Sequence, residues 1–503
     1  MKNIIEMLEN SARKYPDKQV FADADRGISY SEFLDRVYSI GTAIVNSGFN
    51  KEPIAIIAER SVCCLEIMFG VLAGGCFYTV IDSEMPTDRI RAIFNTLKPS
   101  AVIATDGYAE KAADVGGVRV IEYGAATSCR ADKERLSVVR KNIIDTDPAY
   151  VLFTSGSTGV PKGAAVSHRS VLAYIKWFAD TFGIDGNTVF GSQTPFYFSM
   201  SVSDVFSTVY AGASLTVIPK TLFSFPMKLI EFINERRVNT IYWVPSALGI
   251  IANWKVLDYG ELKYINKVLF AGEVMPVKQL DIWRQLYPDV MFVNVYGPTE
   301  VTCNCTYHII DRNTAYDHVI PIGKPFDGDT VFLLDEKNRV IKVNMTNLVG
   351  EVCVSGSRLA VGYYNNPKET ESKFVKNPID NTKKGLIYRT GDLAYYDEQG
   401  DLCYAGRKDF QIKYMGHRIE LMEIEQSLEQ YTDIVNARCI YKNKKIYAFY
   451  TGTAEEKEVR KFLRTQLPMY MIPDSFIKMQ VMPYNLHGKI DRRKLEEGIE
   501  DTV

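Results

Sequence analysis

Helix and strand signals alternate along the chain between about residues 29 and 125, and this alternation restricts the fold more than any other feature. One helical stripe repeats an apolar residue every three or four positions, at Phe33, Val37, Ile40 and Ile44. It is followed by the strand-like run PIAIIA, which ends at Ala58. Repeated alternation of this kind is typical of parallel sheets covered by helices. The sequence therefore predicts an α/β protein with parallel layers.

The pattern changes twice towards the C-terminus. After about residue 330, apolar runs broken by turn residues (VFLLDEKNRV, GEVCVSG and LAYYDEQGDLCYAG) predict a β-rich subdomain. Beyond GRKDFQ, a helix at 423–431, a strand pair around 437–450 and a helix at 455–467 predict a compact α+β domain. We therefore expect a large multi-lobed domain at 1–408 and a small mobile domain at 409–503, since 503 residues exceed one ordinary core.

Composition excludes several classes of protein. The 59 basic and 61 acidic residues are spread without long runs, which gives no surface for nucleic acid or for a membrane. No segment reaches the apolar length of a membrane span, and the N-terminus lacks the apolar core of a signal peptide. The nine cysteines form no CxxC pair, which favours a reducing compartment. We expect a cytoplasmic protein.

A loop rich in glycine and hydroxyl side chains, TSGSTGVPKG at 154–163, follows the apolar run Ala149–Phe153. Glycines let backbone amides approach an anion, and the hydroxyls and the Lys162 ammonium complete a cradle for phosphate. Lys162 follows proline and precedes Gly163, so the loop is not a Walker A motif. No G-x-S-x-G frames its serines, and the five histidines are not clustered, which argues against a serine hydrolase or a metal catalyst. The alternative is a flexible surface turn. The predicted phosphate contacts are Thr154, Ser155, Gly156, Ser157, Thr158, Gly159 and Lys162.

This loop resembles the phosphate-loop signature of the adenylate-forming superfamily, which includes acyl-CoA synthetases, luciferases and nonribosomal peptide adenylation domains. Further motifs follow in the order of that superfamily: AGGCFYTVID-SEMP near residue 80, NVYGPTE at 294–300, YRTGDL at 388–393, GRKDFQIKYMGHRIELMEIE at 406–425, LPMYMIP at 467–473 and HGKIDR at 487–492. They span nearly the whole chain. The segments AGEVMPV and DFQIK look most similar to D-alanine:carrier-protein ligase and to stand-alone adenylation domains.

The resemblance implies ATP and Mg²⁺ as cofactors. It makes Glu300 an oxygen ligand for Mg²⁺ shared with the ATP phosphates, instead of a helix-capping carboxylate. Tyr296 would offer an aromatic face to adenine, and the Asn294 amide would contact the purine edge. Asp392 and Arg407 would contact the ribose. The same turn adds Gly297 and Thr299 to the nucleotide-binding set.

The resemblance also implies the catalytic groups. Lys489 in HGKIDR matches the lysine that stabilises charge as a carboxylate attacks the α-phosphate, and His487 stands where asparagine is common. Thr158 and Glu300 complete the expected catalytic set. Asp409 falls at the hinge about which the small domain swivels between two half-reactions, although a simple turn residue is an equally good interpretation.

The acid-binding motif departs from the superfamily at one position. Enzymes for α-amino acids carry an aspartate there to hold the substrate ammonium, and this chain has Ser199. A buried ammonium without a carboxylate costs several kcal/mol, so we expect an acid without an α-ammonium, such as an aryl acid or a non-α amino acid. The other expected pocket residues are mostly apolar: Met200, Ser203, Tyr242, Leu269, Ala271, Val295, Cys303 and Asn304.

The leading hypothesis is an acid-thiol ligase that forms an acyl-adenylate, with AMP and pyrophosphate as products. It loads a small carboxylic acid onto the phosphopantetheine arm of a carrier protein supplied in trans, because only fourteen residues follow Lys489. Three alternatives stay open: a ligase for D-alanine or another amino acid, an acyl-CoA synthetase using CoA as the thiol, and a catalytically silent nucleotide-binding homologue.

Overall fold

The structure is a computed structural model that describes residues 1–156, 160–253, 257, 260–317, 319–379, 385–484 and 490–499. The chain divides into two compact units. Unit 1 comprises residues 1–83, 98–152 and 163–408, and unit 2 comprises residues 84–97, 153–162 and 409–503. Two short segments of the first 408 residues therefore group with the C-terminal part, which the sequence did not predict.

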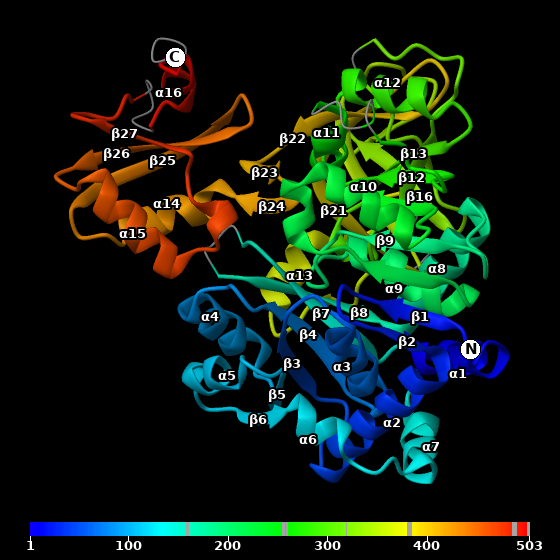
Figure 1. Cartoon of the computed structure of the whole chain (residues 1–503). Helices are drawn as coiled ribbons and strands as arrows, with labels where there is room; N and C mark the ends of the chain where they lie inside the picture. Colours follow the sequence, from blue (N-terminus) through cyan, green and yellow to red (C-terminus); the bar gives the residue numbers. More distant parts are fainter. Residues whose placement is uncertain are drawn as a thin grey trace. The chain divides into compact units, whose positions relative to one another are not determined.

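Unit 1 contains a seven-stranded sheet with the order β19-β8-β7-β4-β3-β5-β6. Figure 1 labels its strands β3 to β8. Its strands are β3 (Pro53–Ala58), β4 (Phe77–Asp82), β5 (Ala101–Ala104), β6 (Arg119–Glu122), β7 (Pro148–Thr154), β8 (Lys162–Ser167) and β19 (Gly362–Tyr363). The pairs β4–β3, β3–β5 and β5–β6 are parallel. Every residue of β3 is buried, as expected for a parallel strand covered on both faces.

A nine-stranded sheet of unit 1 has the order β15-β14-β13-β12-β11-β9-β10-β1-β2. Its strands are β1 (Gln19–Ala22), β2 (Gly27–Ser29), β9 (Val189–Ser192), β10 (Ser214–Val217), β11 (Thr240–Trp243), β12 (Lys267–Phe270), β13 (Met291–Tyr296), β14 (Thr306–Ile309) and β15 (Lys324–Pro325). Its central strands from β1 to β13 are parallel, and the edge pairs are antiparallel. The predicted parallel layers are thereby confirmed.

The helices of unit 1 alternate with its strands over most of the chain. They are α1 (Ile4–Lys14), α2 (Tyr30–Asn46), α3 (Val62–Ala73), α5 (Ala109–Val115), α6 (Tyr123–Thr127), α7 (Lys133–Asn142), α8 (His168–Phe182), α9 (Met200–Ala211), α10 (Pro226–Glu235), α11 (Pro245–Asn253), α12 (Val277–Leu286) and α13 (Pro367–Lys373). Short 3-10 turns are η1 (Lys220–Ser224) and η3 (Thr299–Val301). A capping box between Ser29 and Glu32 starts α2, whose predicted apolar stripe is fully buried.

Aromatic side chains join the elements of unit 1 into one core. Phe21 and Phe33 pack edge to face with ring centroids 4.8 Å apart, and Phe69 lies 5.4 Å from both Phe33 and Phe206. Burial of several such rings stabilises the unit mainly through the hydrophobic effect. Within the described residues, no helix has the length and apolar composition needed to cross a membrane.

A six-stranded antiparallel sheet completes unit 1. Its strands are β16 (Asp329–Leu334), β17 (Val340–Ile341), β18 (Gly350–Gly356), β20 (Phe374–Lys376), β21 (Leu386–Tyr396) and β22 (Leu402–Arg407). Strand β21 pairs with β18, β20 and β22. The apolar runs read from the sequence lie in these strands, so the prediction of a β-rich subdomain is confirmed.

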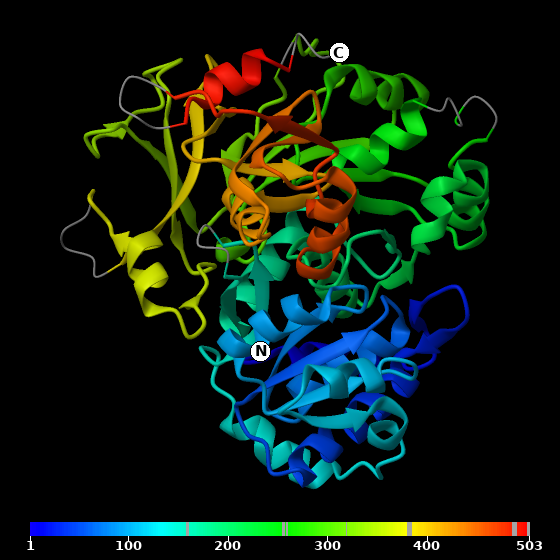
Figure 2. The same ribbon diagram turned by 90° about the vertical axis from the view of Figure 1, so that its left-hand side faces the viewer.

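Unit 2 is an α+β unit (Figure 2). Its elements are α4 (Thr87–Leu97), β23 (Gln411–Tyr414), β24 (His417–Glu420), α14 (Leu421–Glu429), β25 (Ile434–Lys442), β26 (Lys445–Gly452), α15 (Glu456–Gln466), η4 (Met469–Met471), β27 (Ser475–Met479) and α16 (Arg492–Glu497). The helix expected at 423–431 thus lies two residues earlier, and the helix expected at 455–467 is one residue shorter at each end. Ile424, Leu428 and Leu463 belong to the hydrophobic core of unit 2.

Candidate active site

Three parallel strands bring predicted acid-binding residues to one edge of the nine-stranded sheet. Tyr242 of β11 lies beside Leu269 of β12, and Leu269 lies beside β13, which ends with Val295 and Tyr296. The carboxyl ends of neighbouring parallel strands meet at one edge, which is where open α/β sheets bind ligands. Tyr242, Leu269 and Val295 are almost fully buried there, as is Ala271 directly after β12.

The start of α9 supplies Ser199, Met200 and Ser203. Ser199 directly precedes the helix, and its hydroxyl oxygen accepts a hydrogen bond from Thr299 Oγ1 at 3.2 Å. Met200 and Ser203 are buried. Ser199 therefore lies against the turn that carries Glu300, and its recorded partner is a neutral hydroxyl group.

The turn after β13 folds back sharply on itself. A Cβ atom on Gly297 would lie 2.4 Å from Asn304 Cα, so only glycine fits this close approach. Thr302 ends η3 with a φ of 72°, a left-handed conformation that is strained for a β-branched residue. Its hydroxyl donates to the carbonyl oxygen of Arg358 at 2.5 Å, which helps to hold that conformation. The turn thereby sets Cys303 and Asn304 beside the end of β13.

Asn304 lies at the centre of a buried polar cluster. Its Oδ1 accepts hydrogen bonds from the hydroxyls of Tyr174 and Tyr242, each at 2.8 Å. The Cys303 thiol lies 3.1 Å from the same oxygen. The Tyr174 hydroxyl also lies 2.7 Å from Ser203 Oγ, and Ser203 Oγ lies 3.5 Å from Cys303 Sγ. The structure thus brings together Ser203, Tyr242, Cys303 and Asn304, all named from the sequence, and adds Tyr174.

This cluster carries no charge at neutral pH. Burial raises the pKa values of Tyr174 and Tyr242 well above the usual value and raises that of Cys303 to about 11. Asp204 of α9 is also buried, and burial raises its pKa to about 7, against opposing effects that include its backbone hydrogen bonds and the charge of Arg60. The Asp204 carboxyl accepts from the Val205 backbone amide at 3.0 Å.

A second cluster joins three predicted nucleotide-binding residues. The Tyr296 hydroxyl donates to one oxygen of Asp392 at 2.6 Å, and Arg407 Nη1 contacts the other oxygen at 2.7 Å. Asp392 is almost fully buried in β21, and Arg407 lies directly opposite it in β22. Charge-assisted bonds to both oxygens fix the orientation of the carboxylate. The two ribose contacts expected from the sequence therefore lie in direct contact with each other.

Glu300 is fully buried in η3. Its Oε1 accepts a hydrogen bond from the Tyr363 hydroxyl at 2.6 Å, and its carbonyl oxygen accepts from the Ala360 amide at 2.8 Å. The described residues contain no group of three or more histidine, cysteine or acidic side chains that could hold a metal ion. A single carboxylate fits Mg²⁺, which is usually held by one or two carboxylates together with substrate phosphates and water.

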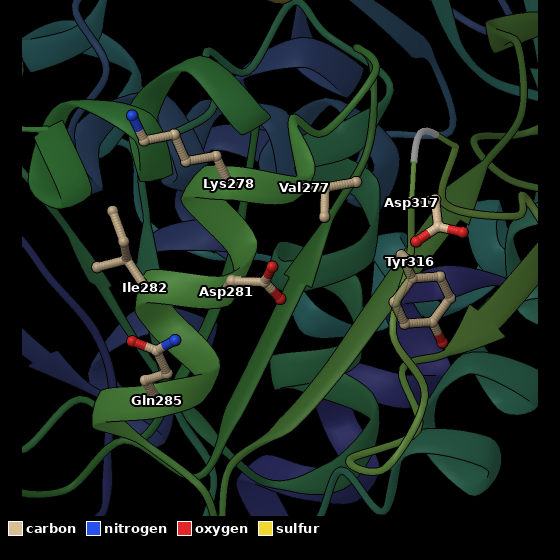
Figure 3. A pocket seen from close by; sticks show the side chains of 7 residues that line it. All are labelled: Val277, Lys278, Asp281, Ile282, Gln285, Tyr316 and Asp317. Atoms are coloured by element: carbon tan, nitrogen blue, oxygen red, sulfur yellow. The ribbon is translucent and has the colours of Figure 1, made fainter.

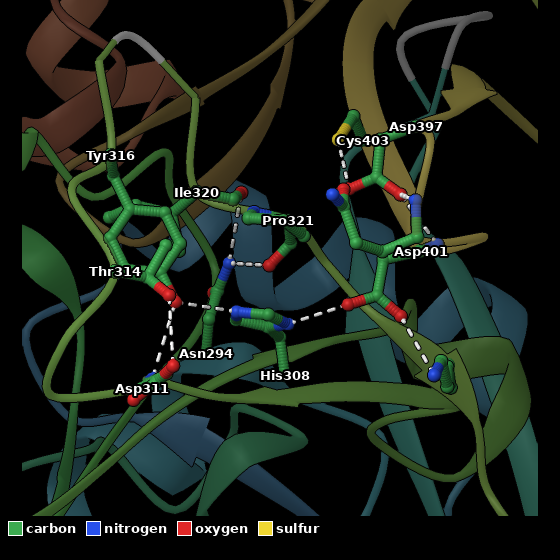
Figure 4. A network of polar contacts seen from close by, with 12 residues as sticks. Asn294, His308, Asp311, Thr314, Tyr316, Ile320, Pro321, Asp397, Asp401 and Cys403 are labelled. Carbon is green, nitrogen blue, oxygen red and sulfur yellow. Dashed lines mark hydrogen bonds and ion pairs between the residues drawn. The ribbon is translucent and has the colours of Figure 1, made fainter. Parts of the chain in front are cut away.

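Asn294 has its amide turned towards the main chain (Figure 4). Its Nδ2 donates to the carbonyl oxygen of Pro321 at 2.8 Å and lies 3.5 Å from that of Ile320. Opposite it in β14, His308 bridges Tyr316 and Asp401 through its two ring nitrogens, at 2.8 and 2.9 Å. The contact of Asn294 with the purine edge stays a prediction.

Of the described residues of the predicted phosphate loop, 154–156 and 160–162 belong to unit 2. The Ser155 hydroxyl donates to the carbonyl oxygen of Arg418 at 2.8 Å and accepts from the Glu420 amide at 3.1 Å. A Cβ atom on Gly156 would clash with the carbonyl oxygen of Val160, which explains the glycine there. Thr154 Oγ1 lies 3.5 Å from the carbonyl oxygen of Lys162, whose side chain is buried. Ser157, Thr158 and Gly159 lie outside the described residues, as do His487 and Lys489.

Asp409 is the first residue of the last segment of unit 2. Its carboxylate accepts from the Gln411 backbone amide at 3.3 Å, which is a turn contact. The hinge role of Asp409 stays a prediction.

A hollow of about 510 Å³ lies elsewhere in unit 1, between α12 and the segment that holds Tyr316 and Asp317 (Figure 3). Five side chains of α12 form its other wall. None of the residues named from the sequence lines this hollow.

Sequence reasoning missed Tyr174 and Tyr363. Tyr174 belongs to the buried apolar stripe of α8, with Val171, Ile175 and Phe178, so its spacing is that of an ordinary core residue. The available signal was chemical, because a buried tyrosine hydroxyl usually finds a hydrogen-bond partner.

Comparison with known proteins identifies relatives over the full chain. The family model described as AMP-binding enzyme matches residues 8–364. The chain is 32% identical to a component of the mycosubtilin synthase of Bacillus subtilis, over 100% of this chain and 19% of that protein. It is 28% identical to L-proline–[L-prolyl-carrier protein] ligase of Streptomyces coelicolor, over 98% of this chain and 96% of that protein.

The chain spans between 8% and 19% of the length of the first five curated relatives, which are large synthases. Among solved structures, the Vibrio cholerae adenylation domain AlmE in complex with glycyl-adenosine-5'-phosphate has the same fold. Its TM-score is 0.87 at 21% identity, with 99% of this chain and 98% of that chain covered. The resemblance carried by the sequence motifs is confirmed, and the chain belongs to the AMP-binding enzyme family.

Proposed function

We propose that this protein activates a small carboxylic acid with ATP and Mg²⁺ and transfers the acyl group to the phosphopantetheine thiol of a carrier protein. The proposal rests on the placement of the segment 295–304. It joins the acid cluster around Asn304 to Tyr296, which contacts the Asp392 carboxylate, and it carries Glu300 between them. One short turn thus supplies groups for both substrates of an adenylation reaction.

In the first half-reaction, a carboxylate oxygen of the acid attacks the α-phosphorus of ATP, and the bond to pyrophosphate breaks. Asp392, oriented by Tyr296 and Arg407, accepts the ribose hydroxyls. Glu300, whose Oε1 accepts a hydrogen bond from Tyr363, would hold Mg²⁺ together with the phosphates, and the bound ion would offset their charge. Lys489 stabilises the negative charge that develops during the attack.

In the second half-reaction, the thiol sulfur attacks the acyl carbon, the bond to AMP breaks, and the thiol proton is lost. We assign the change between the half-reactions to rotation at Asp409, where the chain passes into the last segment of unit 2. The L-prolyl-carrier protein ligase among the relatives supports a carrier protein as the acceptor.

The acid side of the site favours a substrate without an α-ammonium. Ser199 replaces the aspartate expected in α-amino-acid enzymes, and it is bonded to the neutral Thr299 hydroxyl. The cluster around Asn304 is uncharged, and Asp204 is bonded to its own backbone with a raised pKa. A buried ammonium there would lose hydration without gaining an ion pair. An aryl acid or a non-α amino acid fits better.

A second candidate is an amino-acid:carrier-protein ligase, which would include D-alanine as a substrate. The observation in its favour is the 28% identity to the L-prolyl-carrier protein ligase, which extends over 96% of that protein. In this case the ammonium would have to be held by groups other than the residue at position 199.

The proposal is tested by pyrophosphate release over a panel of carboxylic acids, followed by single-turnover transfer to a thiol. We expect acid-dependent pyrophosphate release, and then faster transfer to a phosphopantetheinylated carrier protein than to CoA. Faster transfer to CoA would assign an acyl-CoA synthetase instead. ATP binding without release over the whole panel would indicate a silent nucleotide-binding homologue.

A further inference from the structure

The amide group of Asn304 is held in one orientation by the residues around it. A carbonyl oxygen has two lone pairs. On Asn304 Oδ1, both accept hydrogen bonds, one from the Tyr174 hydroxyl and one from the Tyr242 hydroxyl, each at 2.8 Å. The Cys303 thiol adds a weaker contact at 3.1 Å. The oxygen of Asn304 therefore has no capacity left for a ligand.

The direction of each hydrogen bond follows from the number of available protons. The single hydroxyl proton of Tyr174 goes to Asn304, so the 2.7 Å contact between Tyr174 and Ser203 has Ser203 as the donor. Ser203 and Tyr174 thus form a chain of donors that ends at Asn304 Oδ1. Rotation of the Asn304 amide would require the hydroxyls of Tyr174 and Tyr242 to turn their protons away from it, and Tyr174 to donate to Ser203 instead.

The other end of the Asn304 amide is the Nδ2 donor group. Asn304 is 2% exposed, and no described residue accepts a hydrogen bond from its Nδ2. A bound acid that shields this donor from water without accepting from it leaves the donor unpaired, whereas an acid that offers an acceptor does not. Because the tyrosines and Cys303 stay protonated at neutral pH, the donor belongs to an uncharged cluster.

We propose that Tyr174 is a positioning residue that determines acid specificity by holding the Asn304 amide with its N–H groups towards the substrate. The acid selected in this way carries a neutral hydrogen-bond acceptor, such as an ether, carbonyl or hydroxyl oxygen, on its side group. The inference rests on the proposed function, in which Asn304 belongs to the acid site. Tyr174 itself lies on α8, outside the set of residues read from the sequence motifs.

The test compares acids that differ only in the acceptor. The pairs are 3- and 4-methoxybenzoate against 3- and 4-ethylbenzoate, and O-methylserine against norvaline for the case of an amino-acid substrate. An ether oxygen accepts but cannot donate, whereas the methylene group does neither. The quantity measured is the ratio of kcat/KM for pyrophosphate release within a pair, which cancels general losses of stability.

The wild-type enzyme should prefer the ether acid by about tenfold or more, because the unpaired donor penalises the apolar partner. Tyr174→Phe should bring that ratio close to one. Tyr30→Phe is the matched control, because Tyr30 is equally buried and its hydroxyl lies 2.8 and 2.9 Å from the carbonyl oxygens of Thr208 and Ala213, at the C-terminal end of α9. Its ratio should equal that of the wild type.

Asn304→Leu should abolish the preference as well, and adding Tyr174→Phe to it should change the ratio no further, because both act through one hydrogen bond. A ratio that is equal in the wild type and Tyr174→Phe would overturn the inference, and so would a wild-type preference for the apolar acids. If no acid releases pyrophosphate, the proposed function fails by itself. Calorimetric binding of the same pairs to the wild type and Tyr174→Phe then decides the inference, with the same two ratios expected.

Discussion

The hydroxyl of Tyr296 donates a hydrogen bond to the buried carboxylate of Asp392 at 2.6 Å, across 96 residues of chain. Tyr296 comes from the end of a parallel strand, and Asp392 comes from the antiparallel sheet of the same unit. The contact thus joins a residue expected to stack on adenine to one expected to bind ribose. It preorganises the side chains that we propose to bind the nucleotide.

Removing this hydrogen bond should weaken nucleotide binding. Tyr296→Phe leaves the Asp392 carboxylate with Arg407 as its partner among the described residues, and hydrogen bonds to charged groups contribute about 1.5–3 kcal/mol, so the KM for ATP should rise about tenfold or more. Steady-state pyrophosphate release at varied ATP measures the effect. Tyr150→Phe is the control, because the buried Tyr150 hydroxyl has no hydrogen-bond partner among the described residues. An unchanged KM in Tyr296→Phe would contradict the assigned role of the pair.

The close approach at Gly297 should make that position intolerant of a side chain. In Gly297→Ala, the new Cβ would lie 2.4 Å from Asn304 Cα, which forces the turn carrying Glu300 and Asn304 to shift. A displacement of about 1 Å at a reacting centre can cost about 10²-fold in rate, and we expect a loss of that order in adenylation. Gly124→Ala in α6 is the matched control, since a Cβ there meets nothing within 4 Å. Equal rates for the two variants would show that the turn geometry is not needed.

Burial of Asp204 predicts a pH dependence of stability. Its pKa of about 7 in the folded protein exceeds the ordinary value of 3.8, so the folded state binds the proton more tightly than the unfolded state does. The stabilisation is complete below about pH 4 and is lost as the pH rises through about 7. Asp204→Asn should therefore flatten the decline in melting temperature between pH 5 and pH 8.

Thermal unfolding at several pH values checks this expectation. Asp25→Asn, at an exposed position, should leave the slope of the wild type unchanged. If Asp204→Asn keeps the full slope, the pH dependence arises from other groups.

Lys489 is assigned to catalysis through the HGKIDR motif. Lys489→Ala should lower adenylation by about 10²–10³-fold, the loss expected for one preorganised donor that stabilises transition-state charge. Binding of ATP, measured by equilibrium titration, should be largely unaffected, because the group acts on the reacting phosphate. Pyrophosphate exchange within a few-fold of the wild type would refute the role of Lys489.

The sequence predicted regular elements well wherever local pattern decides them. The run PIAIIA is β3 over the same six residues, because its side chains are all apolar and all buried. The strand pair around 437–450 is β25 and β26, joined by Asn443 and Lys444. Both of these turn residues have positive φ, as a two-residue hairpin requires, although neither is the glycine usually associated with it.

Long-range pairing was beyond such patterns. Strand β27 pairs in parallel with β26 from Ser475 to Met479. Buried and exposed residues alternate too weakly along β27 to predict its partner. The proposed acid site shows the same limit. Motif spacing named Tyr242 and Asn304, whereas Tyr174 contributes through the packing of α8 and has no motif around it.

The most direct test of the account compares acids that differ only by an α-ammonium group. The pairs are propanoate against D- and L-alanine, and 3-phenylpropanoate against D- and L-phenylalanine, with kcat/KM for pyrophosphate release as the measurement. Since an unpaired buried ammonium costs several kcal/mol, the acids without it should be favoured by about 10²-fold, and Ser199→Asp should reduce or reverse that preference. A clear preference of the wild-type enzyme for D-alanine or another α-amino acid would contradict the account.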